Sequence, residues 1–240
     1  MGDLLRRQLQ TMTDTPYQRP IRSFVRRAGR QTRAQDRALG ELWPRYGIQA
    51  PEEGASPILN LKAAFGRAAP TVLEIGFGNG DALVGMAAGN PERNFLGVEV
   101  HAPGVGHCLL AIERLGLKNV RLLMQDAVEV LRERLADNSL AGVHLYFPDP
   151  WHKKRHHKRR LVQPDFVAAL AARLAPGGYV HIATDWPDYA LHIEAVFAAS
   201  DAFKPADTAL TPGNRPHTRF EARGERLGHP IRETIHMRIS

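Results

Sequence analysis

The residues best suited to chemistry surround Asp149, which stands between two prolines at the end of an apolar stretch. The segment Val143-His-Leu-Tyr-Phe-Pro-Asp-Pro-Trp151 predicts a strand that stops at Pro148, because proline cannot continue a central strand. The prolines fix the backbone on both sides of the carboxylate. A rigid carboxylate beside the Trp151 indole can hold a planar heterocycle by edge hydrogen bonds and by stacking. The alternative is a proline-rich exit loop in which Trp151 fills a gap.

A run of positive charge follows directly, His152-Lys-Lys-Arg-His-His-Lys-Arg-Arg160, with six formal cations and no acid. Ordinary solvated faces mix charges of both signs, so a block of one sign indicates contacts with phosphate groups. Its position next to Asp149 favours a nucleic acid substrate over a merely solvated stretch. The three histidines of the run do not indicate a metal site, because the neighbouring cations would repel a divalent ion and no cysteine or carboxylate is interleaved.

A glycine-rich turn predicts a second binding site, for a nucleoside-like ligand. The segment 71–80 reads as a strand that carries Glu74, a tight turn and a helix start. The turn contains three glycines at alternate positions, namely Gly76, Gly78 and Gly80. Glycine suits it because the turn requires positive φ and a Cβ would keep a ligand away from the backbone. Asp81 would repel a pyrophosphate, so the ligand is expected not to be anionic, and S-adenosylmethionine, with its positive sulfonium, fits.

Two further acids follow predicted strands. The segment 94–100 predicts a short buried strand ending in Glu99, about twenty residues after Gly80, the distance at which such folds place an acid on the ribose hydroxyls. The segment 119–124 predicts another strand, and Asp126 follows it, where a carboxylate can accept from the adenine amine. A helix N-cap is almost as good an explanation for Asp126. Acids at three strand ends nevertheless indicate one site beyond the carboxyl edge of a sheet.

Alternating strands and helices from about residue 58 must position these side chains. This α/β pattern predicts a mostly parallel sheet with helices on both faces. The remaining expected elements are helices at 127–135, 164–174 and 187–200, strands at 179–183 and 235–239, and a loop-rich stretch at 204–230. Residues 1–40 are rich in arginine and poor in apolar side chains, so they are expected to form a basic, mobile arm, with one domain at 41–240.

Composition limits the class of protein and its surroundings. The 240 residues carry a formal net charge of +7, which suggests a polyanionic partner. Cys108, the single cysteine, excludes an internal disulfide and indicates a reducing, cytoplasmic location, and its apolar neighbours indicate a buried position without a catalytic role. We expect no signal peptide, because the start at residues 1–7 lacks an apolar core. We expect no membrane span either, since no apolar run reaches the roughly 18 residues that a span needs. The sequence does not decide between a monomer and a homodimer.

Seven short strings carry a more specific signal: Ile21-Arg-Ser-Phe-Val-Arg-Arg27, Glu74-Ile-Gly-Phe-Gly78, Glu99-Val-His-Ala-Pro-Gly-Val-Gly106, Tyr146-Phe-Pro-Asp-Pro-Trp-His-Lys153, Lys158-Arg-Arg160, Ala183-Thr-Asp-Trp186 and Thr218-Arg-Phe-Glu221. In these strings, and in their order, the chain resembles the bacterial tRNA (guanine-N7)-methyltransferases over about residues 20–240. The resemblance implies a Rossmann-like class I methyltransferase fold, with a seven-stranded sheet and a reversed last hairpin. It implies S-adenosylmethionine as donor and a guanosine in the variable loop of tRNA as acceptor.

By motif position, the resemblance also implies roles for individual residues. The cofactor-binding residues would be Glu74, Gly76, Gly78, Gly80, Glu99, Asp126 and Asp149, with Asp149 also catalytic. The substrate-binding residues would be Lys153, Asp185, Thr218, Arg219, Phe220 and Glu221. The RNA-binding residues would be Arg155, His156, His157, Lys158, Arg159 and Arg160. Arg219 departs from the lysine that is more common in the family, but its charge is kept.

The chemistry of the acceptor agrees with these residue types. Guanine N7 carries a lone pair and no proton, so its methylation needs no general base. Catalysis can come from in-line placement of N7 against the sulfonium methyl group, and from carboxylates that stabilise the cation developing on the purine. Asp149 and Asp185 can accept from N1 and N2 of guanine, so we assign Asp149 as an orienting and stabilising group. Which acid contacts guanine and which the donor is left open.

Two other functions fit parts of the sequence. An NAD-dependent oxidoreductase would need a small residue where this chain has Asp81. A non-catalytic RNA-binding protein would use the basic arm and run, but it would not need acids at three strand ends. Binding of S-adenosylhomocysteine without binding of NAD separates the methyltransferase from both.

Overall fold

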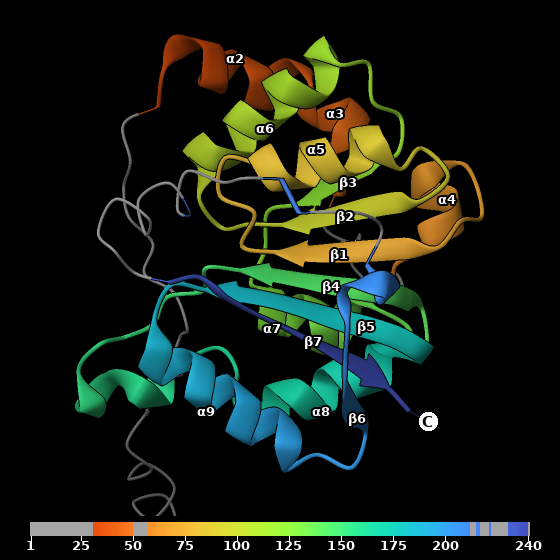
Figure 1. Cartoon of the computed structure of the whole chain (residues 1–240). Coiled ribbons are helices and arrows are strands. Elements are labelled where there is room, and N and C mark those ends of the chain that lie inside the picture. Colours follow the sequence, from red (N-terminus) through yellow and green to blue (C-terminus); the bar gives the residue numbers. More distant parts are fainter. Residues whose placement is uncertain (1–30, 50–56, 212–214, 217–220, 222–229, 240) are drawn as a thin grey trace, which may run out of the picture.

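A single sheet organises the part of the chain that the computed structural model describes, residues 31–49, 57–211, 215–216, 221 and 230–239. Within these residues the sheet has seven strands in the order β3-β2-β1-β4-β5-β7-β6 (Figure 1). The strands are β1 (Thr71–Ile75), β2 (Asn94–Val98), β3 (Val120–Leu123), β4 (Leu140–Tyr146), β5 (Leu174–Thr184), β6 (Phe203–Ala206) and β7 (Arg232–Arg238). Strands β1 to β5 pair in parallel, and β7 runs antiparallel to β5 and β6. This confirms the predicted α/β fold with its reversed last hairpin.

Helices cover both faces of the sheet, which is why β1 and β2 are buried along their whole length. On one face lie α2 (Arg33–Glu41), α3 (Trp43–Tyr46), α5 (Asp81–Gly89) and α6 (Ala102–Arg114). On the other lie α7 (Ala127–Glu129), α8 (Pro164–Arg173) and α9 (Pro187–Ala198). The remaining elements are α4 (Leu61–Phe65), the π-helical turn η1 (Val130–Arg134) and the 3₁₀ segments η2 (Lys154–Arg159) and η3 (Thr208–Leu210). No helix in the described ranges is long and apolar enough to cross a membrane.

Helix α2 lies inside the stretch that the sequence assigns to the arm. A capping box between Thr32 and Gln35 starts the helix, and Ala38 is buried against the core. A Cβ at Gly106 of α6 would lie 2.9 Å from the backbone oxygen of Gln35, so the two helices approach closely. Residues from Arg33 onward therefore pack with the domain. The rest of the expected arm, residues 1–30, lies outside the described residues.

Other elements also differ from the sequence prediction. The helix expected at 127–135 is divided into α7 and the π-turn η1. Strand β5 begins at Leu174 instead of residue 179, with a register irregularity opposite Leu140 and Gly142. Strand β6 lies at the start of the stretch expected to be loop-rich, and its Pro205 would not fit a central strand. At the edge of a sheet, where β6 lies, proline is tolerated.

Candidate functional site

A cavity of about 400 Å³ opens at the carboxyl ends of β1, β2, β3 and β4. Parallel strands of such a sheet bring their carboxyl ends to one edge, where ligands of α/β proteins bind. Five of the residues expected to bind a cofactor line this cavity, namely Gly76, Gly78, Glu99, Asp126 and Asp149. The structure therefore brings together residues that lie up to 73 positions apart in the chain. Two expected residues, Glu74 and Gly80, are not among the lining residues.

The glycine turn has the backbone that the sequence predicts. Gly76, Gly78 and Gly80 have φ angles of 69°, 57° and 84°, which side chains with a Cβ rarely adopt. The Glu99 carboxylate accepts hydrogen bonds from the backbone N–H groups of Gly78 (2.9 Å), Val100 (2.6 Å) and His101 (2.9 Å). Glu99 thus fixes the turn as well as lining the cavity.

Gly80 lets helix α6 pack closely against the turn, and it does not line the cavity. A Cβ at this position would lie 2.4 Å from the Cys108 sulfur of α6. Cys108 is buried, as expected, and burial raises the pKa of its thiol. One turn earlier on α6, a Cβ at Gly104 would lie 2.2 Å from the Gly78 oxygen. Helix α6 therefore lies directly against the glycine turn, and sequence reasoning missed Gly104 although it stands in a quoted string.

Asp126 is the helix N-cap that the sequence offered as one explanation, and it also lines the cavity. It is the N-cap of α7, where its Oδ1 accepts from the Val128 N–H at 2.8 Å, and it lines the cavity. Its neighbour Gln125 also lines the cavity, and the Gln125 Oε1 accepts from the Arg134 guanidinium at 2.9 Å. Arg134 is itself buried and donates to the Pro57 carbonyl at 2.8 Å. Sequence reasoning identified neither Gln125 nor Arg134.

The loop around Asp149 is held in an unusual conformation. Phe147 and Trp151, on either side of the Pro148-Asp149-Pro150 stretch, have φ angles of 52° and 48°. Aromatic residues rarely adopt positive φ, and such conformations persist only where the surroundings enforce them. The Asp149 side chain is exposed at the cavity, and Phe147 and Pro148 line it as well. The sequence does not reveal these strained φ angles.

Glu74 lies beneath the site in a row of polar side chains. The strand register aligns it with His144 of β4, and His144 with His181 of β5. Its Oε2 atom is buried and has no hydrogen-bond partner among the described residues. Burial raises the pKa of the Glu74 carboxyl to about 8, and the charge of Arg215 opposes this shift only in part. Burial therefore favours the protonated form of Glu74.

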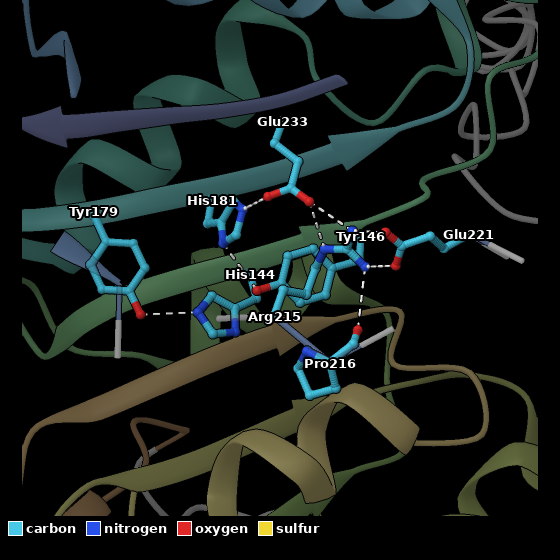
Figure 2. A network of polar contacts seen from close by, with 8 residues as sticks. All are labelled: His144, Tyr146, Tyr179, His181, Arg215, Pro216, Glu221 and Glu233. Atoms are coloured by element: carbon cyan, nitrogen blue, oxygen red, sulfur yellow. Dashed lines mark hydrogen bonds and ion pairs between the residues drawn. The ribbon is translucent and has the colours of Figure 1, made fainter. Parts of the chain in front are cut away.

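Arg215 connects Glu221 with Glu233 of β7 and with Tyr146 at the end of β4 (Figure 2). Its guanidinium donates to both carboxylate oxygens of Glu221, at 2.6 and 2.9 Å, and to Glu233 at 2.7 Å. It also lies over the rings of Tyr146 and Phe147, 5.5 and 5.4 Å from their centroids. Glu221, expected to bind substrate, is thus held by an ion pair beside the Asp149 loop. Arg215 was not identified from the sequence.

The same network continues across β5 and β4 (Figure 2). His181 bonds to Glu233 at 2.8 Å and to the Tyr146 hydroxyl at 3.2 Å, and His144 bonds to the Tyr179 hydroxyl at 2.9 Å. Hydrogen bonding by His181, and then by Arg215, lowers the pKa of Glu233 to about 2 despite partial burial. These side chains form a polar network across β4, β5 and β7.

The expected substrate and RNA residues are only partly brought together. Asp185 follows β5 and is half-buried, while Lys153 is exposed and directly precedes η2. Thr218, Arg219 and Phe220 lie outside the described residues. Of the expected RNA-binding residues, Arg155 and Lys158 are exposed on η2, and His156, His157 and Arg159 are half-buried. Arg160 is buried, so its side chain is not placed for the phosphate contact expected of it.

Comparison with known proteins identifies the family. A family described as "putative methyltransferase" matches residues 68–234. The tRNA (guanine-N(7)-)-methyltransferase of Alkalilimnicola ehrlichii is 56% identical over 216 residues, covering 89% of this chain and 90% of the relative. The protein of that name from Halorhodospira halophila is 53% identical and covers 91% and 95% of the two chains. The protein of that name from Aeromonas hydrophila is 51% identical and covers 95% of this chain and 96% of its own length.

Solved structures support the fold. The 16S rRNA methyltransferase KamB aligns with a TM-score of 0.53 at 16% identity, covering 81% of this chain and 98% of that one. The aminoglycoside resistance methyltransferase NpmB1 aligns with a TM-score of 0.51 at 15% identity, covering 80% and 95%. At these identities the likeness concerns the Rossmann-like methyltransferase fold alone. From the family match and the close relatives together, the chain belongs to the tRNA (guanine-N(7)-)-methyltransferase family.

Proposed function

We propose that this chain transfers the methyl group of S-adenosylmethionine to N7 of a guanosine in the variable loop of tRNA. The proposal rests on one observation, the placement of the cavity, the Asp149 loop and η2 next to one another. A cavity lined by a glycine turn and three carboxylates lies beside the strained Asp149 loop, and the exposed cations of η2 follow that loop. Relatives over half identical carry the corresponding name.

The cavity suits a cationic nucleoside better than a dinucleotide. Glu99, Asp126 and Asp149 line it, and no lysine or arginine stands among its lining residues in the described part of the chain. A cavity lined by carboxylates, and by no lysine or arginine among the described residues, would repel a pyrophosphate and stabilise a cation. Glu99 and Asp126 would hold the adenosine part, close to the glycine turn. When bound, S-adenosylmethionine supplies an electrophilic methyl group on its sulfonium.

The remaining task of the protein is to orient guanine and stabilise its charge. Asp149 and Asp185 follow neighbouring strands, β4 and β5, so their carboxylates can accept from the N1 and N2 donors of one guanine edge. N7 on the other edge stays free to receive the methyl group. Positive charge then develops on the purine, and the fixed carboxylates stabilise it without losing or gaining a proton. Arg155 and Lys158 would contact tRNA phosphates.

Incubation with labelled S-adenosylmethionine and unmodified bulk tRNA, followed by nucleoside analysis, tests the proposal. We expect label in 7-methylguanosine, and label in any other nucleoside would contradict the acceptor assignment. Calorimetry should show binding of S-adenosylhomocysteine and none of NAD. A protein that binds tRNA but no adenosine compound would instead be a non-catalytic RNA-binding protein. We further propose a cytoplasmic enzyme, as the single reduced cysteine suggests, acting as a monomer or homodimer.

A further inference from the structure

Arg160 differs from the other cations of the basic run in its burial. It follows η2 as the C-cap residue, and its side chain is 2% exposed. The cations at Lys153, Lys154, Arg155 and Lys158 are all exposed. A side chain without solvent contact cannot reach a phosphate on the surface of the protein unless the loop rearranges. The positive charge of Arg160 must therefore be satisfied within the protein.

The guanidinium of Arg160 has four partners in the fold. Its Nε donates to the Pro150 carbonyl at 3.0 Å, and its Nη2 contacts His157 Nε2 at 3.1 Å. The same nitrogen forms an ion pair with Asp188, whose pKa is lowered chiefly by this hydrogen bond. The guanidinium also lies 4.9 Å from the centroid of the Tyr189 ring. These partners come from three segments of the chain: the Asp149 loop, η2 and the start of α9.

Two of these partners stand next to the acids of the proposed reaction. Pro150 directly follows Asp149 at the end of β4, and Asp188 lies in the first turn of α9, just after Asp185 at the end of β5. Strands β4 and β5 are parallel neighbours. Arg160 thus joins the two strand ends from which Asp149 and Asp185 would hold guanine. A planar fork of donors can bridge two acceptors in fixed positions, which the point charge of a lysine cannot do.

We propose that Arg160 is a positioning residue for methyl transfer, which fixes the Asp149 loop against the start of α9 instead of binding phosphate. The proposal rests on the proposed function of the chain. It predicts that loss of Arg160 lowers the rate of the chemical step, because a displacement of about 1 Å in a reacting group costs about 10²-fold in rate. It also predicts that tRNA binding keeps its salt dependence, since no phosphate contact is lost.

The experiment compares Arg160→Gln with two matched cation removals, Lys158→Gln on η2 and Lys118→Gln before the amino end of β3. For Arg160→Gln we expect a single-turnover rate constant, at saturating tRNA and S-adenosylmethionine, that is about 10- to 100-fold lower. The slope of log affinity against log salt for tRNA should equal that of the wild type. Lys158→Gln should flatten that slope by about 0.7 to 0.9. Lys118→Gln, at the opposite end of the sheet, should change neither quantity.

Two further variants separate positioning from charge and from folding. Arg160→Lys keeps the charge but not the fork, so its rate should stay well below that of the wild type. Asp188→Asn removes the charge of one partner but keeps a side-chain oxygen that can accept from Arg160, so it should lower the rate less. Combined with Arg160→Gln it should add little, because both changes break one contact.

The proposal is overturned if Arg160→Gln flattens the salt slope as Lys158→Gln does, or if its rate is unchanged. If Arg160→Gln does not fold, an unchanged single-turnover rate constant in Asp188→Asn overturns the proposal instead. A purely structural role would lower the melting temperature and leave the rate per folded active site intact. A wild-type protein that does not methylate tRNA refutes the proposed function separately, and the salt slopes still decide whether Arg160 contacts phosphate.

Discussion

Asp149 presents an exposed carboxylate in a loop whose Phe147 and Trp151 have strained φ angles, and this arrangement makes a direct prediction. Asp149→Ala should lower turnover on tRNA by about 10²- to 10³-fold, the usual cost of losing a preorganised electrostatic contact. The melting temperature should stay close to that of the wild type, because the exposed side chain contributes little to the core.

Steady-state methylation and thermal unfolding of the same preparations check this prediction. Asp201→Ala, which removes an equally exposed carboxylate from the turn before β6, is the matched control and should keep full turnover. Near-normal turnover in Asp149→Ala would show that Asp149 neither orients guanine nor stabilises its charge.

Glu74 gives a second prediction at the residue scale, through its pKa of about 8 in the folded protein against 4.5 for an ordinary glutamate. Between these values the folded chain holds a proton that the unfolded chain has released, so stability falls as pH rises from 4.5 to 8. Glu74→Gln removes this dependence. The free energy of unfolding of the wild type, relative to the variant, should fall by up to about 1.4 kcal/mol per pH unit within this range.

Urea unfolding of both proteins at pH 6, 7, 8 and 9, without cofactor, measures that difference. The shift of Glu233, whose pKa is lowered to about 2, acts only below pH 4.5 and does not enter this range. His144 and His236, whose pKa values are lowered by burial, are present in both proteins and cancel in the comparison. Parallel stability curves would mean that Glu74 is ionised in the folded protein.

At the scale of elements, helix α6 supports the glycine turn from behind. A methyl group at Gly104 would lie 2.2 Å from the Gly78 oxygen, so Gly104→Ala must push the turn or the helix away. Overpacking of this kind costs about 1 to 3 kcal/mol. Since Gly78 lines the cavity, we expect affinity for S-adenosylhomocysteine to fall at least about tenfold.

Calorimetric titration with S-adenosylhomocysteine measures this loss. Gly89→Ala in α5 is the matched control, because a Cβ there would meet nothing within 4 Å, and its affinity should equal that of the wild type. Equal affinities in all three proteins would show that the turn tolerates displacement, and that the contact of α6 with Gly78 has no role in binding.

The segment η2 separates binding of RNA from binding of the cofactor. Changing Arg155 and Lys158 to alanine removes two exposed cations and should flatten the salt dependence of log tRNA affinity by about 0.7 to 0.9 for each. Affinity for S-adenosylhomocysteine should not change, since neither residue lines the cavity. An unchanged salt slope would make η2 an ordinary solvated surface.

Over the whole molecule, sequence patterns predicted the elements that depend on residues close together in the chain. Apolar runs, glycines and prolines marked five parallel strands, the glycine turn and the end of β4 before Asp149, because each depends on neighbours in the sequence. The spacing also placed Glu99 and Asp126 at one edge of the sheet, where the cavity is.

The missed features depend on contacts between distant segments. Arg160 meets Asp188 across 28 positions, and Arg215 meets Glu233 across 18, so no local pattern distinguishes these arginines from solvated ones. The spacing likewise does not show which way a residue near the turn faces. Glu74 and Gly80 were therefore assigned to the cavity, although one lies beneath it and the other packs on α6.

The two margins of the sheet limit how copies of this protein can associate. At one margin, β6 is four residues long and contains Pro205 and the exposed Lys204, features that discourage another strand from pairing. At the other, Gly47 already bridges Leu122 of β3. Among the described residues, growth of the sheet from one molecule into the next is therefore discouraged on both sides. We expect a homodimer to form through helices or loops, and we expect the same features to disfavour fibrous aggregation.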